Sequence, residues 1–324
     1  MNHDCIQNLR DRLQRRMRLL DSSETFVFHD RLRHFWKFLH QEPILHGIIE
    51  DLKRRYETVN PDDEETDNFN IWGKDETEHV GIALARIREC VHHIDANIEA
   101  NVGLGLNQGG KLDGGLTVFQ QTFLHPLYDY LEEHLDDQRA LLALLRRYKH
   151  RCEWFRRGAL LALWQSDPGK GERKLTYDLY EYLHDQGLDF AIEPSSASGK
   201  PDLISAQVGN EKLIADAKVY RDDTPKAYLA SGFHQIYQYT LDYNQPFGYL
   251  VIFKTCENDL KFPMSEQEQS IPFLVHNNKT IFFVVVDICQ HEATASKRGI
   301  LRTVEVTEAD LIQTATVSTA TGAV

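Results

Sequence analysis

The segment Ile214-Ala-Asp-Ala-Lys-Val219 decides how the second half of this 324-residue chain is interpreted. Side chains two positions apart lie on the same face of a β-strand, and this segment alternates with that period. Asp216 and Lys218 therefore share one face, while the intervening apolar residues point the other way. A carboxylate and an ammonium among apolar neighbours are costly to bury unless a charged ligand uses them. The pattern predicts a functional site on this strand.

Two further acids precede this strand in the sequence. An expected helix carries Glu172 on its buried stripe, so that this acid faces a sheet and not water. A short strand opens on Asp202, behind a proline of the kind tolerated at a strand start. Gly209-Asn210 is a tight-turn dipeptide, so the two strands are expected to form a hairpin. Such a hairpin would bring Asp202 and Asp216 within reach of one ion.

The residues after this strand extend the pattern. Gln235 and Tyr239 are four positions apart on the next expected helix and lie on one of its faces. The runs Gly248–Phe253 and Ile281–Val286 are continuously apolar, as in central strands that are buried on both faces. The second half is thus expected to hold a central sheet flanked by helices.

These motifs, in this order, resemble those of the PD-(D/E)xK nuclease superfamily, which has the restriction-endonuclease-like fold. Pro201-Asp202 matches the first half-motif, and Asp216-Ala217-Lys218 matches the second. Glu172 stands where many members carry an upstream helical acid, and Gln235-x-x-x-Tyr239 matches the glutamine motif of RecB-like branches. The resemblance covers about residues 158–290. It implies an α+β or α/β domain with a mixed central sheet between helices.

The resemblance also implies Mg²⁺, with Mn²⁺ able to substitute, because a hard divalent ion takes oxygen ligands and lowers the pKa of bound water. The implied ligands are Glu172, Asp202, Asp216 and the backbone carbonyl of Ala217. Lys218 would orient the attacking water or stabilise the phosphorane, and nearby carboxylates favour its charged form over a role as general base. Gln235 would act with these catalytic groups, and Tyr239 would position the substrate.

Because the family mostly cuts DNA, the resemblance implies a DNA endonuclease. Nucleases of this kind joined to a helical module look like effectors of prokaryotic restriction or antiviral defence. Double-strand cleavage needs two active sites, so a homodimer or higher homo-oligomer is expected, with a protein of the same defence system as a possible partner. Three alternatives stay open: an RNase on the same fold, a catalytically silent nucleic-acid-binding module, and a helical interaction protein whose second half is a scaffold.

Bulk properties are compatible with this interpretation except for the charge. The chain is 42% apolar and 26% charged, and it contains no apolar run that could span a bilayer. Five dispersed cysteines and the absence of a signal-peptide segment predict reduced thiols in the cytoplasm. The net charge of −13 is unusual for a DNA-binding protein, but phosphate contact depends on local patches. Basic residues crowd 10–18 and 146–157, either as solvated helix faces or as contact patches.

Helical spacing dominates the first half. We expect a helical bundle domain over 1–157 for sensing, dimerisation or partner docking, the nuclease domain over 158–300, and a partly disordered tail over 301–324. The expected helices span about 3–20, 22–57 with a break at Pro43, 80–98, 117–136 and 138–165. Asn101–Gly115 contains six glycines and is expected to be irregular.

Three motifs of the first half are weighed against simpler interpretations. Gly105–Lys111 has phosphate-loop spacing, but Leu112 replaces the hydroxyl residue and the preceding segment is expected to be helical, which argues against nucleotide binding. The adjacent His92 and His93 diverge on a helix and cannot share a metal.

The segment Tyr148–Phe155 mixes basic and aromatic residues, as nucleic-acid stacking surfaces do. The favoured interpretation is a helix that packs Tyr148, Cys152 and Phe155 inward.

Overall fold

The computed structural model describes residues 5–56, 73–107, 110–167, 169–187, 190–192, 203–206, 212–268, 270–290 and 301–318. By its contacts the chain divides into a helical unit, Ile6–Gln138, and an αβ unit, which is Arg139–Val324 with Met1–Cys5. This division falls earlier in the chain than the predicted boundary after residue 157. Within the described ranges, no helix combines the length and apolar character needed to cross a bilayer. All five cysteines are free thiols.

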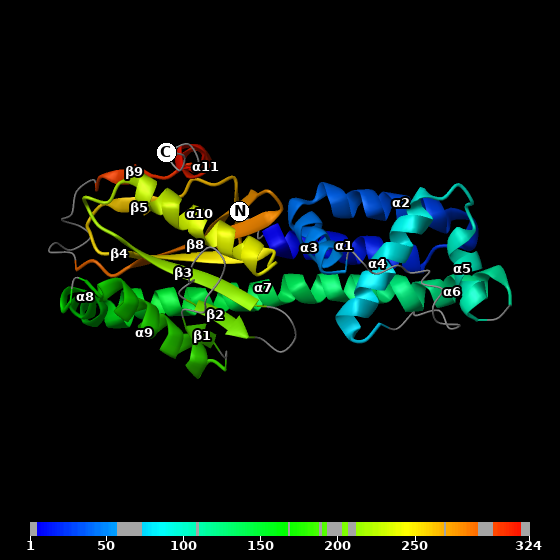
Figure 1. Cartoon of the computed structure of the whole chain (residues 1–324), viewed down its shortest axis with the longest axis horizontal. Coiled ribbons are helices and arrows are strands. Elements are labelled where there is room, and N and C mark those ends of the chain that lie inside the picture. Colours follow the sequence, from blue (N-terminus) through cyan, green and yellow to red (C-terminus); the bar gives the residue numbers. More distant parts are fainter. Residues whose placement is uncertain are drawn as a thin grey trace, which may run out of the picture. The chain divides into compact units, whose positions relative to one another are not determined.

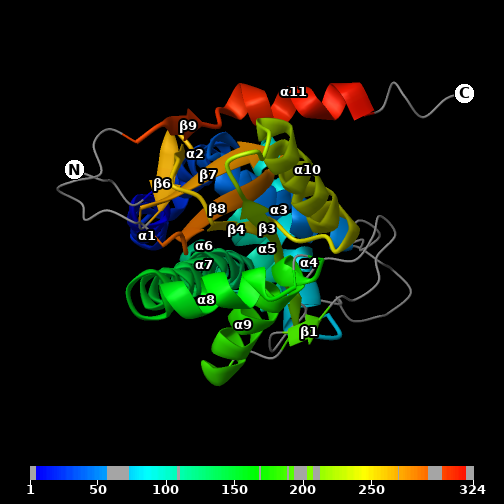
Figure 2. The ribbon, with the colours of Figure 1, turned by 90° about the vertical axis from the view of Figure 1, so that its left-hand side faces the viewer.

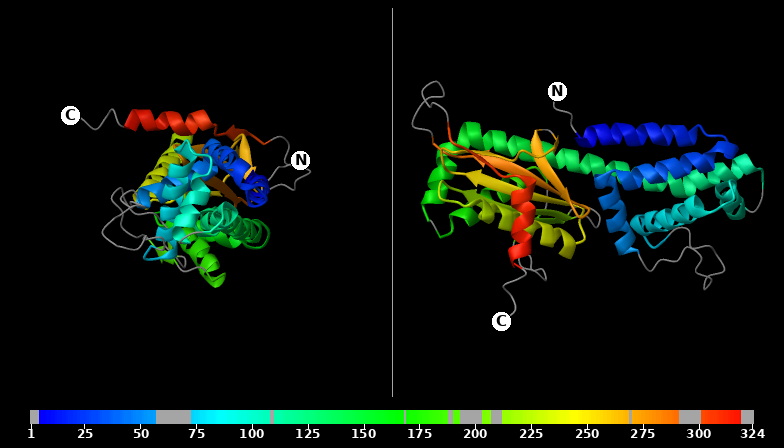
Figure 3. Two further views of the ribbon diagram at one scale, coloured as in Figure 1. Left: turned by 90° about the vertical axis from the view of Figure 1, so that its right-hand side faces the viewer. Right: turned by 90° about the horizontal axis from the view of Figure 1, so that it is seen from above.

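The helical unit follows the apolar periodicity of its sequence. Its elements are α1 (Cys5–Asp21), α2 (Thr25–Gln41), α3 (Pro43–Arg55), α4 (Glu76–His92), α5 (Ile98–Leu106), α6 (Leu112–Phe119), the π-helical turn η1 (Gln120–Leu124) and the first part of α7 (His125–Arg151). The predicted break at Pro43 is confirmed: Glu42 is extended and the proline opens α3. Figure 3 shows the change of direction between α2 and α3 (both blue) at this point.

The glycine-rich stretch is helical over much of its length, so the expectation of irregular structure was wrong there. Helix α5 runs to Leu106, and α6 begins at Leu112. A Cβ atom on Gly103 would lie 1.9 Å from the carbonyl oxygen of Gly115, and one on Gly115 would lie 2.3 Å from that of Ala100. The glycines therefore let two helix backbones touch, and this packing outweighs their low helix propensity.

Helix α7 is also longer than expected. The sequence suggested two helices joined at Asp136-Asp137, but α7 runs unbroken from His125 to Arg151 (Figure 1). Neither aspartate breaks a helix, and both are exposed. Leucines before and after them are buried, namely Leu127, Leu131, Leu135, Leu141, Leu142 and Leu145. The apolar stripe thus continues through the polar pair.

The αβ unit has a mixed sheet. Its elements are η2 (Cys152–Arg156), α8 (Arg157–Gln165), α9 (Gly171–Asp185), β1 (Phe190–Ile192), β2 (Leu203–Ala206), β3 (Lys212–Tyr220), α10 (Lys226–Asp242), β4 (Phe247–Lys254), β5 (Asp259–Lys261), β6 (Glu266–Glu268), β7 (Ile271–His276), β8 (Lys279–Asp287), β9 (Thr303–Glu305) and α11 (Glu308–Ser318). The order in the larger sheet is β1-β2-β3-β4-β8-β7-β6, and β5 pairs separately with β9. Strands β3, β4 and β8 are parallel, and the outer pairs are antiparallel.

The arrangement confirms a mixed central sheet flanked by helices. Every residue of β4 is buried, as predicted for its apolar run, and β8 beside it is nearly so. Helix α10 covers one face of β3, β4 and β8, with Phe233 and Ile236 fully buried against them. Helices α8 and α9 lie on the other side of the sheet, where α9 contacts β3 (Figure 2). The antiparallel pairing of β2 with β3 was also predicted.

Residues 301–318, in the segment expected to be a partly disordered tail, carry regular structure. Strand β9 pairs with β5, and α11 packs against α10. Val306 and Leu311 are completely buried there. The last residues, 319–324, lie outside the described ranges.

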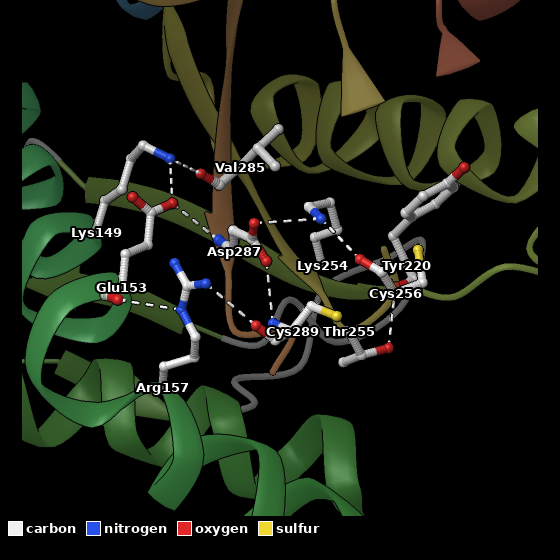
Figure 4. Close-up of polar contacts among 10 residues, drawn as sticks. All are labelled: Lys149, Glu153, Arg157, Tyr220, Lys254, Thr255, Cys256, Val285, Asp287 and Cys289. Atoms are coloured by element: carbon white, nitrogen blue, oxygen red, sulfur yellow. Dashed lines mark hydrogen bonds and ion pairs between the residues drawn. The ribbon is translucent and has the colours of Figure 1, made fainter. Parts of the chain in front are cut away.

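The C-terminal part of α7 and the turn η2 are fixed to the carboxyl end of the sheet (Figure 4). Lys149 donates to the backbone carbonyl of Val285 and pairs with Glu153, whose carboxylate accepts the backbone N–H of Asp287 at 2.9 Å. Arg157 donates to the carbonyl of Cys289 at 3.2 Å. These contacts join one helical segment to the end of β8.

The interpretation of Tyr148–Phe155 was right for two of its three inward residues. Tyr148 and Cys152 are completely buried, but Phe155 is 76% exposed and its neighbour Trp154 is 74% exposed. The π-helical turn η2 accounts for the difference, because its wider winding rotates the later residues away from the face that a regular helix would bury. The ring of His150 stacks on that of Trp154.

Candidate active site on strand β3

Asp216 and Lys218 lie side by side on β3, as their spacing predicted. The Nζ atom of Lys218 is 2.7 Å from Oδ2 of Asp216, and the two residues are 9% and 2% exposed. Burying an ion pair carries a desolvation cost that the attraction between the charges seldom exceeds by much. A pair of this kind adds little net stability to the sheet, which favours a functional reason for keeping it.

Helix α10 confines the side chain of Lys218 from above. A Cβ atom on Gly232 would lie 3.1 Å from Cγ of Lys218 and 3.4 Å from Cδ1 of Leu250. The glycine therefore leaves space for the aliphatic stem of the lysine beneath the helix. Because the stem is enclosed, the position of the ammonium group is set by packing as well as by Asp216.

Glu172 reaches the same strand from the first turn of α9. Its Oε2 atom accepts the backbone N–H of Val219 at 3.1 Å and the hydroxyl of Tyr228 at 2.8 Å. Val219 directly follows Lys218 in β3, so the third predicted residue lies beside the pair. The prediction that Glu172 faces the sheet is confirmed.

Tyr228 was not predicted from the sequence, although a signal for it exists. Tyr228, Gly232, Gln235 and Tyr239 follow one another on α10 at spacings of four, three and four residues, which places them along a single helix face. Burial, together with the adjacent carboxylate of Glu172, raises the pKa of Tyr228 to about 12. This phenol therefore stays protonated at neutral pH and donates to Glu172.

Gln235 and Tyr239 lie farther along the same face of α10. The side-chain amide of Gln235 donates to the Tyr239 hydroxyl at 2.8 Å, and Tyr239 is only 2% exposed. The helical glutamine and tyrosine are thus coupled to each other, on the face that carries Tyr228 and Gly232. Their predicted contact with water or substrate stays a prediction.

The remaining predicted ligands are Asp202 and the carbonyl of Ala217. Asp202 lies outside the described residues; Leu203, which follows it, pairs with Ala215, the residue before Asp216. Ala217 is buried within β3 between the two charged residues. The described donor set, carboxylates from Glu172 and Asp216, consists of hard oxygen atoms and suits Mg²⁺ or Mn²⁺ better than a thiolate-seeking metal.

A second lysine–acid pair, missed from the sequence, lies where the apolar runs of β4 and β8 end; its lysine is buried and its acid is half-buried. Nζ of Lys254 is 3.2 Å from Oδ2 of Asp287 and donates to the carbonyl of Cys256 at 2.7 Å (Figure 4). Oδ1 of Asp287 accepts the backbone N–H of Cys289 at 3.0 Å. Both side chains thus also form hydrogen bonds with backbone groups. The pair therefore has a structural role, in which it joins the ends of β4 and β8.

Many of the basic residues that suggested contact patches have internal partners. In the helical unit Arg10 pairs with Glu132 and Asp136, and Arg12 pairs with Glu42. In the αβ unit Arg156 pairs with Asp178. Neither cluster is simply a solvated helix face.

In its described residues, the segment with phosphate-loop spacing, Gly105–Lys111, does not have the strand-loop-helix structure of a phosphate-binding loop. As expected, helix α5 and not a strand precedes it, and Lys111 stands just before α6. Residues 108–109 lie outside the described ranges.

Comparison with protein-family models gives no match, and comparisons with curated proteins and with solved structures give none either. The functional argument therefore depends on the residues and their geometry.

Proposed function

We propose that the αβ unit is a metal-dependent nuclease of the PD-(D/E)xK superfamily that hydrolyses DNA phosphodiester bonds. One observation carries the proposal: Glu172, from a helix, accepts the backbone N–H of Val219, the residue that directly follows the Asp216–Lys218 pair on β3. An acid from a helix beside this strand motif supports the superfamily assignment. The order β3-α10-β4 supports the proposal, because α10 carries Gln235 and packs over the parallel strands β3 and β4, on the face of β3 that carries Lys218.

Each side chain has a role that its contacts support. Asp216 and Glu172 would hold the Mg²⁺ ion, with Asp202 and the Ala217 carbonyl completing the set. The ion, when bound, supplies positive charge to the phosphate and lowers the pKa of a water. Lys218 provides a second positive charge at a position fixed by Gly232 and Asp216. Tyr228 fixes the orientation of Glu172 by hydrogen bonding to it.

The proposal extends to context only through the superfamily resemblance. It includes an endonuclease effector of prokaryotic restriction or anti-phage defence in the cytoplasm, acting as a homo-oligomer with the helical unit as sensor or docking module. The proposal also includes a partner protein from the same defence system.

The decisive experiment is cleavage of supercoiled plasmid with Mg²⁺ by the full chain, compared with Asp216→Asn and Lys218→Met. Both variants keep the volume of the side chain and remove its charge. We expect each to cleave at least about 100-fold more slowly, since positioned charge and proton-transfer groups contribute factors of about 10²–10⁴. A chelator should abolish the wild-type activity, and Mn²⁺ should restore it.

Lys254→Met is the matched control, because it removes a buried lysine of comparable exposure from the neighbouring strand. It should cleave at the wild-type rate at a temperature where all variants are folded by circular dichroism. Full activity of Asp216→Asn, or equal losses in the Lys218 and Lys254 variants, would show that the β3 pair is not catalytic. A parallel reaction with labelled RNA distinguishes an RNase from a DNase.

A further inference from the structure

The corner between α2 and α3 gathers three potential ligands that the nuclease site does not use. His40 is the last residue but one of α2, and His46 and Glu50 are four positions apart on α3, so they share a face. Glu42 is extended and Pro43 opens α3, which turns the chain sharply at this point. The turn brings the face of α3 that carries His46 and Glu50 beside the end of α2, where His40 lies.

The three side chains have the spacing of a metal site. Nδ1 of His40 is 3.0 Å from Nδ1 of His46, and one donor atom from each of His40, His46 and Glu50 lies within 4.8 Å of the other two. Two ligand atoms on one tetrahedral zinc, each at about 2.0–2.1 Å from it, are about 3.3 Å apart. The nitrogens need to separate by only a few tenths of an ångström to accept the ion. All three residues are half-buried.

A cavity adjoins these ligands. Its volume is about 390 Å³, and His40 and Glu50 form part of its wall together with Trp36, Lys53, Arg88 and His92. The ring of Trp36 packs edge-on against His40 with centroids 4.6 Å apart, which restrains the orientation of that imidazole. Three protein ligands leave a fourth coordination position, as in catalytic and regulatory zinc sites.

Other groups of the protein compete only weakly with a metal ion for these three side chains. Lys53 lies 3.5 Å from Oε1 of Glu50, but both side chains are partly exposed to solvent, and ion pairs of this kind are weak. Without a metal, the two imidazoles share a single hydrogen bond. A cation would replace that bond and take the carboxylate from Lys53.

We propose that His40, His46 and Glu50 bind one zinc-class divalent cation, whose fourth position faces the cavity. Imidazole nitrogens select Zn²⁺ and related ions over Mg²⁺, so this site is separate from the nuclease metal in chemistry as well as in location. Once freed from Glu50, Lys53 adds to the positive charge of Arg88 on the cavity wall and favours an anionic group or hydroxide as fourth ligand.

The test is calorimetric titration of the full chain with Zn²⁺, in the presence of excess Mg²⁺, for wild type, His46→Gln and Glu50→Gln. One equivalent should bind to the wild type, and each substitution should weaken that binding at least about tenfold. His92→Gln is the matched control, since it removes a histidine from the wall of the same cavity without removing a ligand, and it should bind as wild type does.

Two further measurements keep the result decisive. Co²⁺ in place of Zn²⁺ should give the intense visible absorption of a four-coordinate ion in wild type, which does not depend on a variant folding. Asp216→Asn should bind Zn²⁺ normally whether or not the nuclease proposal is right. Absence of tight binding by wild type, or an equal loss in His92→Gln, would overturn the site and identify scattered surface histidines as the cause of any residual uptake.

Discussion

The phenol of Tyr228 connects two segments of the chain that are far apart in sequence. It donates to Glu172, fifty-six residues earlier, and lies half-buried beside β3. Burial and the Glu172 carboxylate raise its pKa to about 12. A tyrosine in the unfolded chain titrates near about pH 10. Stability from the protonated phenol is therefore complete below about pH 10 and is lost as the pH rises towards about 12.

Tyr228→Phe removes this titration. We expect the wild type to lose more folding free energy than the variant between about pH 9 and pH 11, because only the wild type keeps a proton at position 228 that its unfolded chain releases. Urea denaturation at the two pH values measures the difference. Tyr177→Phe, at a more exposed position on α9, is the control. Identical pH slopes for wild type and Tyr228→Phe would contradict the contact with Glu172.

At the scale of single residues, the sequence predicted which side chains lie together when they belong to one element with a regular period. Asp216 and Lys218 are two positions apart on one strand, and the period of a strand alone places them together. Tyr228 could not be predicted in the same way. Its contact depends on how α9 approaches the end of β3, and no local pattern specifies the packing of one element against another.

Helix α11 consists mostly of small and polar residues, which explains why the sequence suggested disorder. Among the side chains of this segment that the structure describes, Val306 and Leu311 are completely buried. Polar contacts at its start add to them. The Asp310 carboxylate accepts the backbone N–H of Thr307 and pairs with Lys226 of α10, each at 2.9 Å, and these contacts lower its pKa to about 2.

Leu311→Ala tests whether α11 is docked. Removing a fully buried leucine should cost about 2–5 kcal/mol of unfolding free energy in the αβ unit, measured by urea denaturation. Ile312→Ala, next in sequence but 37% exposed, should cost less than about 1 kcal/mol. Equal and small effects of both substitutions would mean that the helix is frayed in solution.

Element prediction succeeded where burial alone determines structure. The apolar runs of β4 and β8 form central strands because only a central position in the sheet buries both faces of a strand. It failed at α5 and α6, where Gly103 and Gly115 break no helix because the close contact between the two backbones favours helix. It failed again at Asp136-Asp137, since exposed polar residues do not interrupt a stripe that continues on the opposite face of the helix.

At the scale of the whole molecule, the division into units has a consequence for fragments. The αβ unit begins within α7, and Tyr148 and Cys152 in that part are completely buried. We expect fragment 139–324 to fold and to unfold cooperatively. Fragment 158–324 lacks the buried Tyr148, whose loss alone should cost about 3–5 kcal/mol, and it should melt at lower temperature or aggregate. Circular dichroism melts of the two fragments, with the full chain as reference, measure this.

Equal melting temperatures for the two fragments would instead support a boundary after residue 157. The sequence favoured that later boundary because the superfamily resemblance covers about residues 158–290.

The contacts made by basic residues at the end of α7 and directly after it also affect how a polyanion such as a nucleic acid could bind. Lys149, Arg156 and Arg157 each bind an acid or a carbonyl of their own chain, and the chain as a whole carries −13. Cations bound in this way release few counterions when a nucleic acid arrives, and the overall field repels phosphate at a distance. Recognition would then act at short range, with the metal as the chief attraction, and association would be slow but only weakly dependent on salt.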